Sequence, residues 1–587
     1  MKFLGNVLAT IVGLFLFFML SFVGLLLIGA LFGGSSEHVV VENNSVIELD
    51  LSQIQNDYAG KFNYKDFDYY EAKHDGLFDV IRAIKEAKTD DNIKGISILN
   101  DQSNLGMAQI KALRNELESF KKSGKFVLAY SNAYTQKEYY LNSVANTIYL
   151  NPIGELEFKG LSSELLFFKD FQEKYGLKME VIRHGKYKSA VEPFLENKMS
   201  DANREQVSAL LNSVWNTMVA DISTSRKIPV ANLNSIANGL LARTPEMAKN
   251  QKLVDIIAYE DVYHNDIKKA LKVDLKKEYN KISIKEYADN IATTAKESSS
   301  DNRIAVIYAQ GEIGSGEGDI TTIGEGSMRR SLQDARNDED VKAIVLRIDS
   351  PGGSAVTSEL IWREIELTKK VKPVVVSLGN YAASGGYYIA CNGDVIISEA
   401  NTITGSIGVF GTLPNFSPLT EKMGIHAEQV STHENAADYS VFTPLNEKFR
   451  AVTQEGVEKI YNTFVNRVAT GRKMTFQQVD AIAQGRVWSG TEALKIGLVD
   501  KIGGMDLALE EAARLAKIKE YRTKSFPEFE KNFDDLFAQL GLPFMKSKEQ
   551  FIKEELGIEN YKVIEQIKKV QARKGIQAAM PFEIIIK

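Results

Sequence analysis

The stretch Ile344-Val-Leu-Arg-Ile-Asp-Ser-Pro-Gly-Gly-Ser354 has the pattern of a buried strand that runs into a glycine-rich turn. The first half of the chain contains a counterpart, Ile96-Ser-Ile-Leu-Asn-Asp-Gln-Ser-Asn104, which keeps the strand but lacks Pro-Gly-Gly. A Tyr-Tyr pair follows each stretch, and aligning the two pairs sets Gln136 opposite Ser384. A repeat of this length indicates two copies of a whole domain rather than a solenoid of short units.

Hydrophobic periodicity gives the same order of elements in both halves. We expect helices over residues 78–88, 107–122, 328–337 and 356–370, and strands over residues 95–99, 126–130, 343–348 and 374–377. Short strands that alternate with such helices are typical of βαβ units around a buried parallel sheet. The predicted fold class is therefore α/β, with two tandem repeats.

Composition excludes several classes of protein. The chain has 587 residues and a formal net charge of −6, which argues against a nucleic-acid-binding protein because such proteins normally present a basic face. The six histidines are scattered and Cys391 is the single cysteine, so there is no intrachain disulfide and no cluster with metal-ligand spacing. We expect neither a metal nor a cofactor.

The N-terminal segment predicts a membrane anchor. Residues 3–36 contain no charged side chain, Lys2 precedes them, and Glu37 and Glu42 follow. An apolar run of roughly 20 residues is long enough to span a bilayer, and the charge bias places the N-terminus in the cytoplasm. The alternative is a cleaved signal peptide with a site near Gly29 or Gly33, although its apolar core is usually about 7–15 residues.

The predicted organisation has five segments: an anchor over 1–36, a first repeat over 37–295, a linker over 296–302, a second repeat over 303–520, and a charged helical tail over 521–587. The linker is polar and lacks apolar periodicity. We interpret the tail as a packing or assembly surface, with a strand-like end over residues 582–586.

Ser384 is a candidate nucleophile that only the second repeat contains. Gly385 and Gly386 follow it and allow close approach of a substrate carbonyl, and a helix that begins here would present free N–H groups to an oxyanion. The alternative role for this serine is a simple helix N-cap. The turn over residues 349–354 could supply a second oxyanion donor, or be only a tight βα connection.

Two kinds of base could activate this serine. Asp394 and His433 follow Ser384 in the order of an α/β-hydrolase triad, but Ala382 breaks the Gly-x-Ser-x-Gly elbow. A lysine base must be neutral, which requires burial to lower its pKa. Lys188 is a candidate, although its local sequence alone is compatible with a surface lysine.

Four segments together resemble the signal peptide peptidase SppA family in its long, duplicated bacterial form. They are Gly185-Lys-Tyr-Lys-Ser-Ala-Val-Glu-Pro-Phe194, Asp349-Ser-Pro-Gly-Gly-Ser354, Ala382-Ala-Ser-Gly-Gly-Tyr387 and Thr404-Gly-Ser-Ile-Gly-Val-Phe410. The resemblance covers nearly the whole chain after the anchor. It implies the fold of the Clp protease and crotonase superfamily, with one βαβ spiral in each repeat.

The resemblance also implies a serine–lysine dyad split between the repeats. Ser384 would be the nucleophile and Lys188 the general base, the N–H groups of Gly353 and Gly385 would form the oxyanion hole, and Ser406 would orient the lysine. The implied protein is a homo-oligomer, which we expect to be a tetramer, in the bacterial inner membrane with its catalytic domains in the periplasm. Its implied partners are signal peptides, other membrane-associated peptides and inner-membrane lipid.

Two alternatives from other classes stay open at this point. A crotonase-like acyl-CoA enzyme would share the fold and the paired glycine loops, but it needs neither Lys188 nor a membrane span. An inactive membrane scaffold would use the duplicated domains only for assembly.

Overall fold

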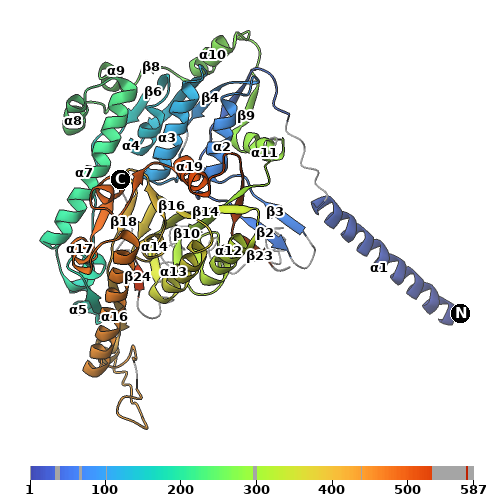
Figure 1. The fold of residues 1–587 in the computed structure, drawn as a ribbon. Coiled ribbons are helices and arrows are strands. Elements are labelled where there is room, and N and C mark those ends of the chain that lie inside the picture. Colours follow the sequence, from blue (N-terminus) through green and yellow to red (C-terminus); the bar gives the residue numbers. More distant parts are fainter. Residues whose placement is uncertain are drawn as a thin grey trace.

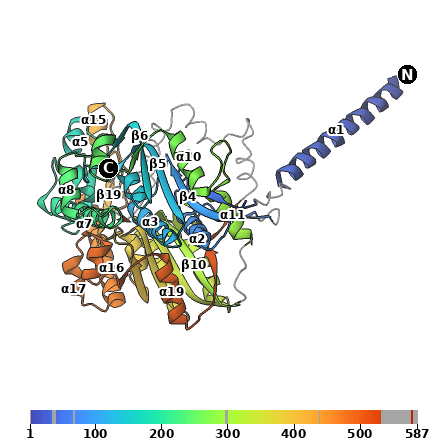
Figure 2. The ribbon, with the colours of Figure 1, turned by 90° about the horizontal axis from the view of Figure 1, so that it is seen from above.

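A computed structural model describes residues 2–32, 40–64, 69–100, 102–294, 300–437, 439–531 and 577–579. Two large sheets, one from each repeat, form the centre of the molecule, and helices cover them (Figures 1 and 2). Each sheet has its own buried apolar cluster, in which aliphatic and tyrosine side chains predominate. This arrangement confirms the α/β class, since buried parallel strands need helices on their faces.

The first repeat contains a six-stranded sheet in the order β8-β6-β5-β4-β1-β9, in which every neighbouring pair is parallel. Its strands are β1 (Ser45–Glu48), β4 (Ile93–Leu99), β5 (Phe126–Tyr134), β6 (Thr147–Leu156), β8 (Ile256–Ile257) and β9 (Lys281–Ser283). Its helices are α2 (Leu77–Ala87), α3 (Met107–Lys121), α4 (Gln136–Asn142), α5 (Lys169–Tyr175), α6 (Glu192–Leu195), α7 (Asp201–Arg226), α8 (Val230–Asn238), α9 (Pro245–Asn250), α10 (Glu260–Leu271) and α11 (Ile284–Thr294).

The second repeat contains an eight-stranded sheet with the main order β20-β18-β16-β14-β10-β22, and β17 pairs with β16 and β21. Its strands are β10 (Arg303–Gln310), β14 (Val341–Ser350), β16 (Val374–Ala383), β17 (Val395–Ser398), β18 (Ile403–Gly405), β20 (Val487–Ser489), β21 (Lys501–Ile502) and β22 (Arg522–Phe526). Its helices are α12 (Glu325–Asn337), α13 (Ala355–Lys369), α14 (Gly385–Ala390), α15 (Ser417–Lys422), α16 (Glu447–Arg472), α17 (Phe476–Ile482), α18 (Gly490–Lys495) and α19 (Met505–Ala516).

A third sheet joins the two repeats, in the order β12-β13-β11-β15-β24-β19-β7. Its strands are β7 (Lys178–His184), β11 (Glu312–Gly314), β12 (Gly318–Asp319), β13 (Thr322–Gly324), β15 (Gly352–Ser354), β19 (Val409–Asn415) and β24 (Gln577–Ala579). Strand β7 comes from the first repeat, yet it pairs antiparallel along its whole length with β19 of the second. This pairing carries the segment that follows β7 into the second repeat.

A small sheet in the order β23-β2-β3 packs beside the second repeat, with strands β2 (Lys61–Tyr64), β3 (Tyr69–Ala72) and β23 (Glu528–Lys531). The segment just before β2 contributes Asp57, whose carboxylate lies 2.6 Å from the Nε of Arg347 on β14. Both side chains are buried, so this is a buried ion pair that links the segment before β2 to the central strand of the second repeat. Removing either partner would leave the other buried charge uncompensated.

The expected elements exist in this structure, and most of their ends agree to within a few residues, although β16 runs six residues beyond the expected strand over 374–377. The helices that we expected over 107–122 and 356–370 are α3 and α13, and the strand expected over 343–348 is the centre of β14. The region after residue 520 differs, because β22 and β23 form where we expected a helical tail. Strand β22 pairs with β10 at the edge of the second sheet, a long-range contact that local composition does not reveal. The strand expected over 582–586 lies outside the described residues, as does most of the expected linker.

The N-terminal helix α1 (Lys2–Phe32) projects from the body of the molecule (Figure 1). Among the residues that the structure describes, no helix meets the length and apolarity required to cross a membrane. The membrane anchor therefore stays a prediction from the sequence.

Candidate active site

Ser384 lies at the junction between β16 and α14, the position of a nucleophile that is presented from the end of a strand. Its backbone has φ 55° and ψ −115°, a conformation that is costly for a residue with a Cβ. The Ser384 N–H donates to the carbonyl of Gly405 at 2.8 Å, and the N–H of Tyr388 donates to the carbonyl of Ser384 at 2.8 Å. These hydrogen bonds fix the strained residue on both sides, so the hydroxyl has a defined direction.

Lys188 reaches this serine from the first repeat. Its Nζ lies 3.0 Å from the Oγ of Ser384, 3.0 Å from the Oγ of Ser406 and 3.2 Å from the carbonyl oxygen of Ser406. The lysine side chain is fully buried, and this burial lowers its pKa to about 7. An ammonium that has lost its hydration and has no carboxylate among these contacts releases its proton easily. Near neutral pH a large fraction of Lys188 is therefore an uncharged amine that can accept a proton.

Backbone contacts with the second repeat hold the loop that contains Lys188. The N–H of Tyr187 donates to the carbonyl of Gln484 at 2.8 Å. The next residue, Gly485, is itself fixed within the second repeat, because its N–H donates to the carbonyl of Ile407 at 2.8 Å. Gly485 has φ 82°, and a methyl group on its Cα would lie 2.6 Å from the backbone nitrogen of Lys188. Only glycine fits here, so residue 485 sets how closely the lysine loop approaches. Sequence reasoning missed Gly485, because nothing local connects it with a loop almost 300 residues earlier.

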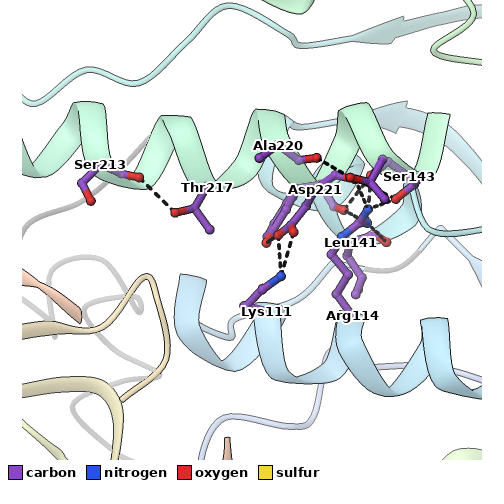
Figure 3. Close-up of polar contacts among 11 residues, drawn as sticks. Lys111, Arg114, Leu141, Ser143, Ser213, Thr217, Ala220 and Asp221 are labelled. Atoms are coloured by element: carbon purple, nitrogen blue, oxygen red, sulfur yellow. Dashed lines mark hydrogen bonds and ion pairs between the residues drawn. The ribbon is translucent and has the colours of Figure 1, made fainter. Parts of the chain in front are cut away.

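Helix α7 supports the same loop from the other side. Gln206 on this helix donates from Nε2 to the Oγ of Ser189 at 2.7 Å, next to the lysine. Nearer its C-terminal end, α7 is attached to α3 through Asp221, whose two carboxylate oxygens lie 2.8 Å from the Nζ of Lys111 (Figure 3). Arg114 on α3 adds a hydrogen bond to the carbonyl of Asp221 at 3.1 Å. The sequence did not single out Gln206 either, since nothing in a helical segment indicates which residue a polar side chain will contact in the folded protein.

Two glycine segments meet beside the serine. Gly352 and Gly353 on β15 have φ 101° and 154°, and a methyl group on Gly352 would lie 2.8 Å from the backbone nitrogen of Gly385. The backbone of the β15 loop and the first N–H groups of α14 therefore converge next to Ser384. Backbone donors arranged in this way can stabilise an oxyanion without reorganisation. The structure thus brings Gly352, the chain neighbour of Gly353, next to Gly385 and hence beside Ser384. The oxyanion-hole role of Gly353 and Gly385 stays a prediction.

Asn380 connects the first repeat to this glycine loop. Its Oδ1 accepts the N–H groups of Ala108 and Gln109 at 3.2 Å each, at the start of α3, and its Nδ2 donates to the Oδ2 of Asp349 at 3.0 Å. Asp349 in turn accepts the N–H of Tyr381 at 2.9 Å and directly precedes the glycine turn. Burial raises the pKa of this carboxyl. One amide side chain thus caps a helix of one repeat and holds the residue that precedes the glycine turn of the other.

The histidine alternative is not assembled. Asp394 accepts the N–H of Val374 at 2.8 Å and pairs with Lys369 at 3.3 Å. His433 is exposed and its Nδ1 lies 3.0 Å from the hydroxyl of Thr432, its neighbour in the chain. The sequence order of a triad is present, but the structure puts Lys188 rather than a histidine at the serine.

Comparison with known proteins agrees with a duplicated peptidase. The model of peptidase family S49 matches this chain twice, over residues 119–274 and 366–519, which together are more than half of the chain. The chain belongs to peptidase family S49. Protease 4 of Haemophilus influenzae is 38% identical over 447 residues, which cover 75% of this chain and 72% of that protein. Protease 4 of Salmonella typhi is 38% identical over 461 residues, covering 76% and 73%.

A relative from a chloroplast is also similar. The chloroplastic serine protease SPPA of Arabidopsis thaliana is 32% identical over 441 residues, which cover 74% of this chain and 64% of that protein. Among solved structures, a point mutant of ClpP1 from Listeria monocytogenes matches 35% of this chain and 94% of its own, with 16% identity and a TM-score of 0.25. Membership of family S49 confirms the prediction of a serine peptidase of the SppA type with two peptidase domains.

Proposed function

We propose that this S49 peptidase is a membrane-anchored endopeptidase that uses Ser384 and Lys188 as a dyad to degrade signal peptides after their removal from preproteins. The observation that carries the dyad is the distance of 3.0 Å between Lys188 Nζ and Ser384 Oγ, in a site where both side chains are fully buried. The neutral amine takes the proton of Ser384 as the hydroxyl oxygen attacks the scissile carbonyl. The protonated amine then donates to the leaving nitrogen, and in its neutral form activates the water that hydrolyses the acyl-enzyme.

The remaining site residues have supporting roles in this mechanism. The N–H groups of Gly353 and Gly385 stabilise the tetrahedral oxyanion, because they are fixed where the negative charge develops. Ser406 contacts the same Nζ at 3.0 Å and keeps it directed at the serine. No step of this reaction needs a metal or a cofactor.

The proposed location rests on the sequence. The uncharged segment 3–36 would anchor the chain in the bacterial inner membrane, with its N-terminus in the cytoplasm and the peptidase domains in the periplasm. An anchor raises the effective concentration of the enzyme near peptides that stay in the same bilayer. We also propose that the protein assembles as a homo-oligomer, with the tetramer as the expected form.

The test uses the full chain in vesicles of phosphatidylethanolamine and phosphatidylglycerol, together with a synthetic signal peptide inserted in the same bilayer. We expect wild type to fragment this peptide and Ser384→Ala to leave it intact, as followed by mass spectrometry. Cleavage by Ser384→Ala would show that the dyad is wrong. If wild type cleaves only soluble peptides and spares the inserted one, the substrate class is wrong.

A further inference from the structure

A cavity of about 350 Å³ lies where the two repeats meet. Helices α2 and α3 of the first repeat and strand β14 and helix α19 of the second all contribute to its lining. The ion pair between Lys85 on α2 and Asp506 on α19, at 3.3 Å, joins the two repeats beside it. The candidate residues of the dyad and the oxyanion hole are not among the residues that line this cavity. Its volume is within the range of about 300–1,000 Å³ that is typical of small-molecule sites.

Glu399 adds a carboxyl group without a partner to the lining of this cavity. The residue directly follows β17 and is only 2% exposed. Its Oε1 has no hydrogen-bond partner among the residues that the structure describes. A buried carboxylate is costly unless a counter-ion, a hydrogen-bond donor or a ligand satisfies it. This carboxyl group therefore indicates a ligand that brings its own donor and a positive charge.

The other charges of the lining also favour a cation. Arg347 faces the cavity, but its charge is already balanced, because its Nε donates to the carboxylate of Asp57 at 2.6 Å. Asp506 and Glu510 add two exposed carboxylates one turn apart on α19, where the cavity meets solvent. The lining thus has more negative than positive charge, which an ammonium group neutralises and an anionic ligand would increase.

The shape of the lining suits an alkyl chain between two charged ends. Apolar side chains of α2 and α19 line the cavity, namely Leu77, Phe78, Ile81, Met505 and Leu507. A methyl group on Gly504, the N-cap of α19, would lie 2.6 Å from the Oε1 of Glu399, so this carboxyl group is next to the start of α19. Asp506 and Glu510 follow Gly504 by about 3 and 9 Å along the helix axis, at a rise of about 1.5 Å per residue. A linear diamine spans such a separation with an ammonium group at each end.

We propose that this cavity binds a linear alkyl diamine, with one ammonium group on the carboxylate of Glu399 and the other beside Asp506 and Glu510. The alkyl chain lies along the apolar side chains of α2 and α19. The ligand contacts both repeats, so its binding stabilises their pairing, on which the proposed dyad also depends. The site itself is independent of the proposed peptidase function, because it shares no residue with the candidate active site.

The ionisation of Glu399 makes this binding depend on pH. Charged groups from several elements surround its carboxyl group, namely Arg347, Lys111, Asp57, Asp221, Glu116, Asp506 and Glu510. Burial has the largest influence and raises the pKa of Glu399 to about 7. The carboxyl group is therefore neutral below that pH and charged above it, whereas an alkylammonium group keeps its charge over this range. Affinity for the diamine is about tenfold higher at pH 8 than at pH 6.

The experiment titrates the full chain, in a neutral detergent, with diaminopentane, pentylamine or pentanol in an isothermal titration calorimeter. We expect diaminopentane to bind most tightly at pH 8, pentylamine to bind several-fold more weakly because it lacks the second ammonium group, and pentanol not to bind. Binding of neither amine, or equal binding of the neutral alcohol, would overturn the proposal. Equal affinity for diaminopentane at pH 6 and pH 8 would also overturn it, because the exposed carboxylates alone would then hold the amine.

Variants identify the carboxyl groups that are responsible. Glu399→Gln keeps the shape of the side chain, and its loss of charge should lower the affinity for both amines at pH 8 by at least about tenfold. Glu364→Gln is the matched control, since Glu364 is also a buried carboxylate of the second repeat but pairs with Arg336 at 3.1 Å and does not line the cavity. It should bind both amines as wild type does.

Glu510→Gln tests the outer end of the site. It should reduce the affinity for diaminopentane toward that for pentylamine and leave pentylamine binding unchanged. Thermal unfolding without amine checks that each variant is folded, and the pH comparison uses wild type, so it decides the question even if Glu399→Gln does not fold. Unchanged amine binding by folded Glu399→Gln would contradict the proposal.

Discussion

The two repeats of this chain share a framework and differ where chemistry takes place. In the first repeat the hydroxyl of Tyr139 donates to the carbonyl of Leu253 at 2.9 Å, and in the second the hydroxyl of Tyr387 donates to that of Leu498 at 2.7 Å. Helices α7 and α16 have 26 residues each and occupy corresponding places after the catalytic segments. The scaffold was therefore kept in both copies.

The position of the nucleophile shows what changed. Gln136 stands where the second repeat has Ser384, and its amide forms hydrogen bonds with a nearby loop. Its Oε1 accepts the N–H groups of Lys159 and Gly160 at 3.0 and 2.9 Å, and its Nε2 donates to the carbonyl of Gly160 at 2.9 Å. Where the second copy has the hydroxyl of Ser384, the first copy has an amide that forms structural hydrogen bonds. The first copy contributes Lys188 to the candidate site instead. The structure places Lys188 of the first copy 3.0 Å from Ser384 of the second, and under the proposed dyad the two copies are two halves of one site rather than one active and one inactive domain.

The largest expected effect comes from removing the hydroxyl itself. Ser384→Ala should lower kcat/KM by at least about 10³-fold, because no nucleophile remains. Gln136→Ala, the matched change in the first repeat, should leave kcat/KM near the wild-type value and lower the melting temperature, since it removes buried hydrogen bonds. Steady-state cleavage of a fluorogenic peptide and thermal unfolding measure both. A large loss of activity in Gln136→Ala would contradict the division of roles.

The pH dependence tests the contribution of the first repeat. Because burial lowers the pKa of Lys188 to about 7, the amine is protonated and inactive below that pH and neutral above it. We expect kcat/KM to rise about tenfold per pH unit up to about pH 7 and then level off. Lys188→Met should remove both the activity and this transition.

Lys186→Met is the control for that experiment, because this lysine belongs to the same loop. It should keep the wild-type profile. An acid limb centred far from pH 7 would mean that another group titrates.

A smaller effect is expected for the residue that orients the lysine. Ser406→Ala removes the hydroxyl 3.0 Å from Lys188 Nζ and leaves the contact with Ser384. The variant keeps the base but holds the Lys188 amine less precisely toward Ser384. We expect this to reduce kcat by about 10- to 100-fold with little change in KM. Phe158 corresponds to Ser406 in the repeat alignment, so this hydroxyl also exists only in the copy with the nucleophile. An equal rise in KM would point to a substrate-binding role instead.

The smallest expected effect concerns the junction between the repeats. Asn380→Ala leaves the N–H groups of Ala108 and Gln109 without their acceptor, which should cost about 1–3 kcal/mol in the free energy of unfolding. Asn132 is its counterpart, and the Oδ1 of this exposed residue accepts hydrogen bonds only from its own repeat. Asn132→Ala should therefore cost less than about 1 kcal/mol. Denaturant titration measures both variants, and equal losses would mean that Asn380 does not join the repeats.

Much of the fold could be predicted because local patterns decide it. The alternation of apolar strands and amphipathic helices indicated α3, β14 and α13, and the glycines around Ser384 indicated a sharp strand-to-helix turn. The resemblance to a known family supplied the pairing of Ser384 with Lys188, which local sequence alone left open. The roles of Gly485 and Gln206 could not be predicted, because both residues act through contacts with the Lys188 loop, which is not adjacent to them in the sequence.

By itself, the sequence determined the duplication, the βαβ order and the loss of serine and Pro-Gly-Gly from the first copy, since these depend on residue types and spacing. Only the tertiary structure decided that β7 crosses to pair with β19 and buries Lys188 beside Ser384. The low pKa of the lysine is likewise a property of the folded site, because the effect comes from the loss of water around a charge. The same holds for β24. The sequence of its three residues does not predict a strand, and they form one because they pair with β15 and β19 on either side.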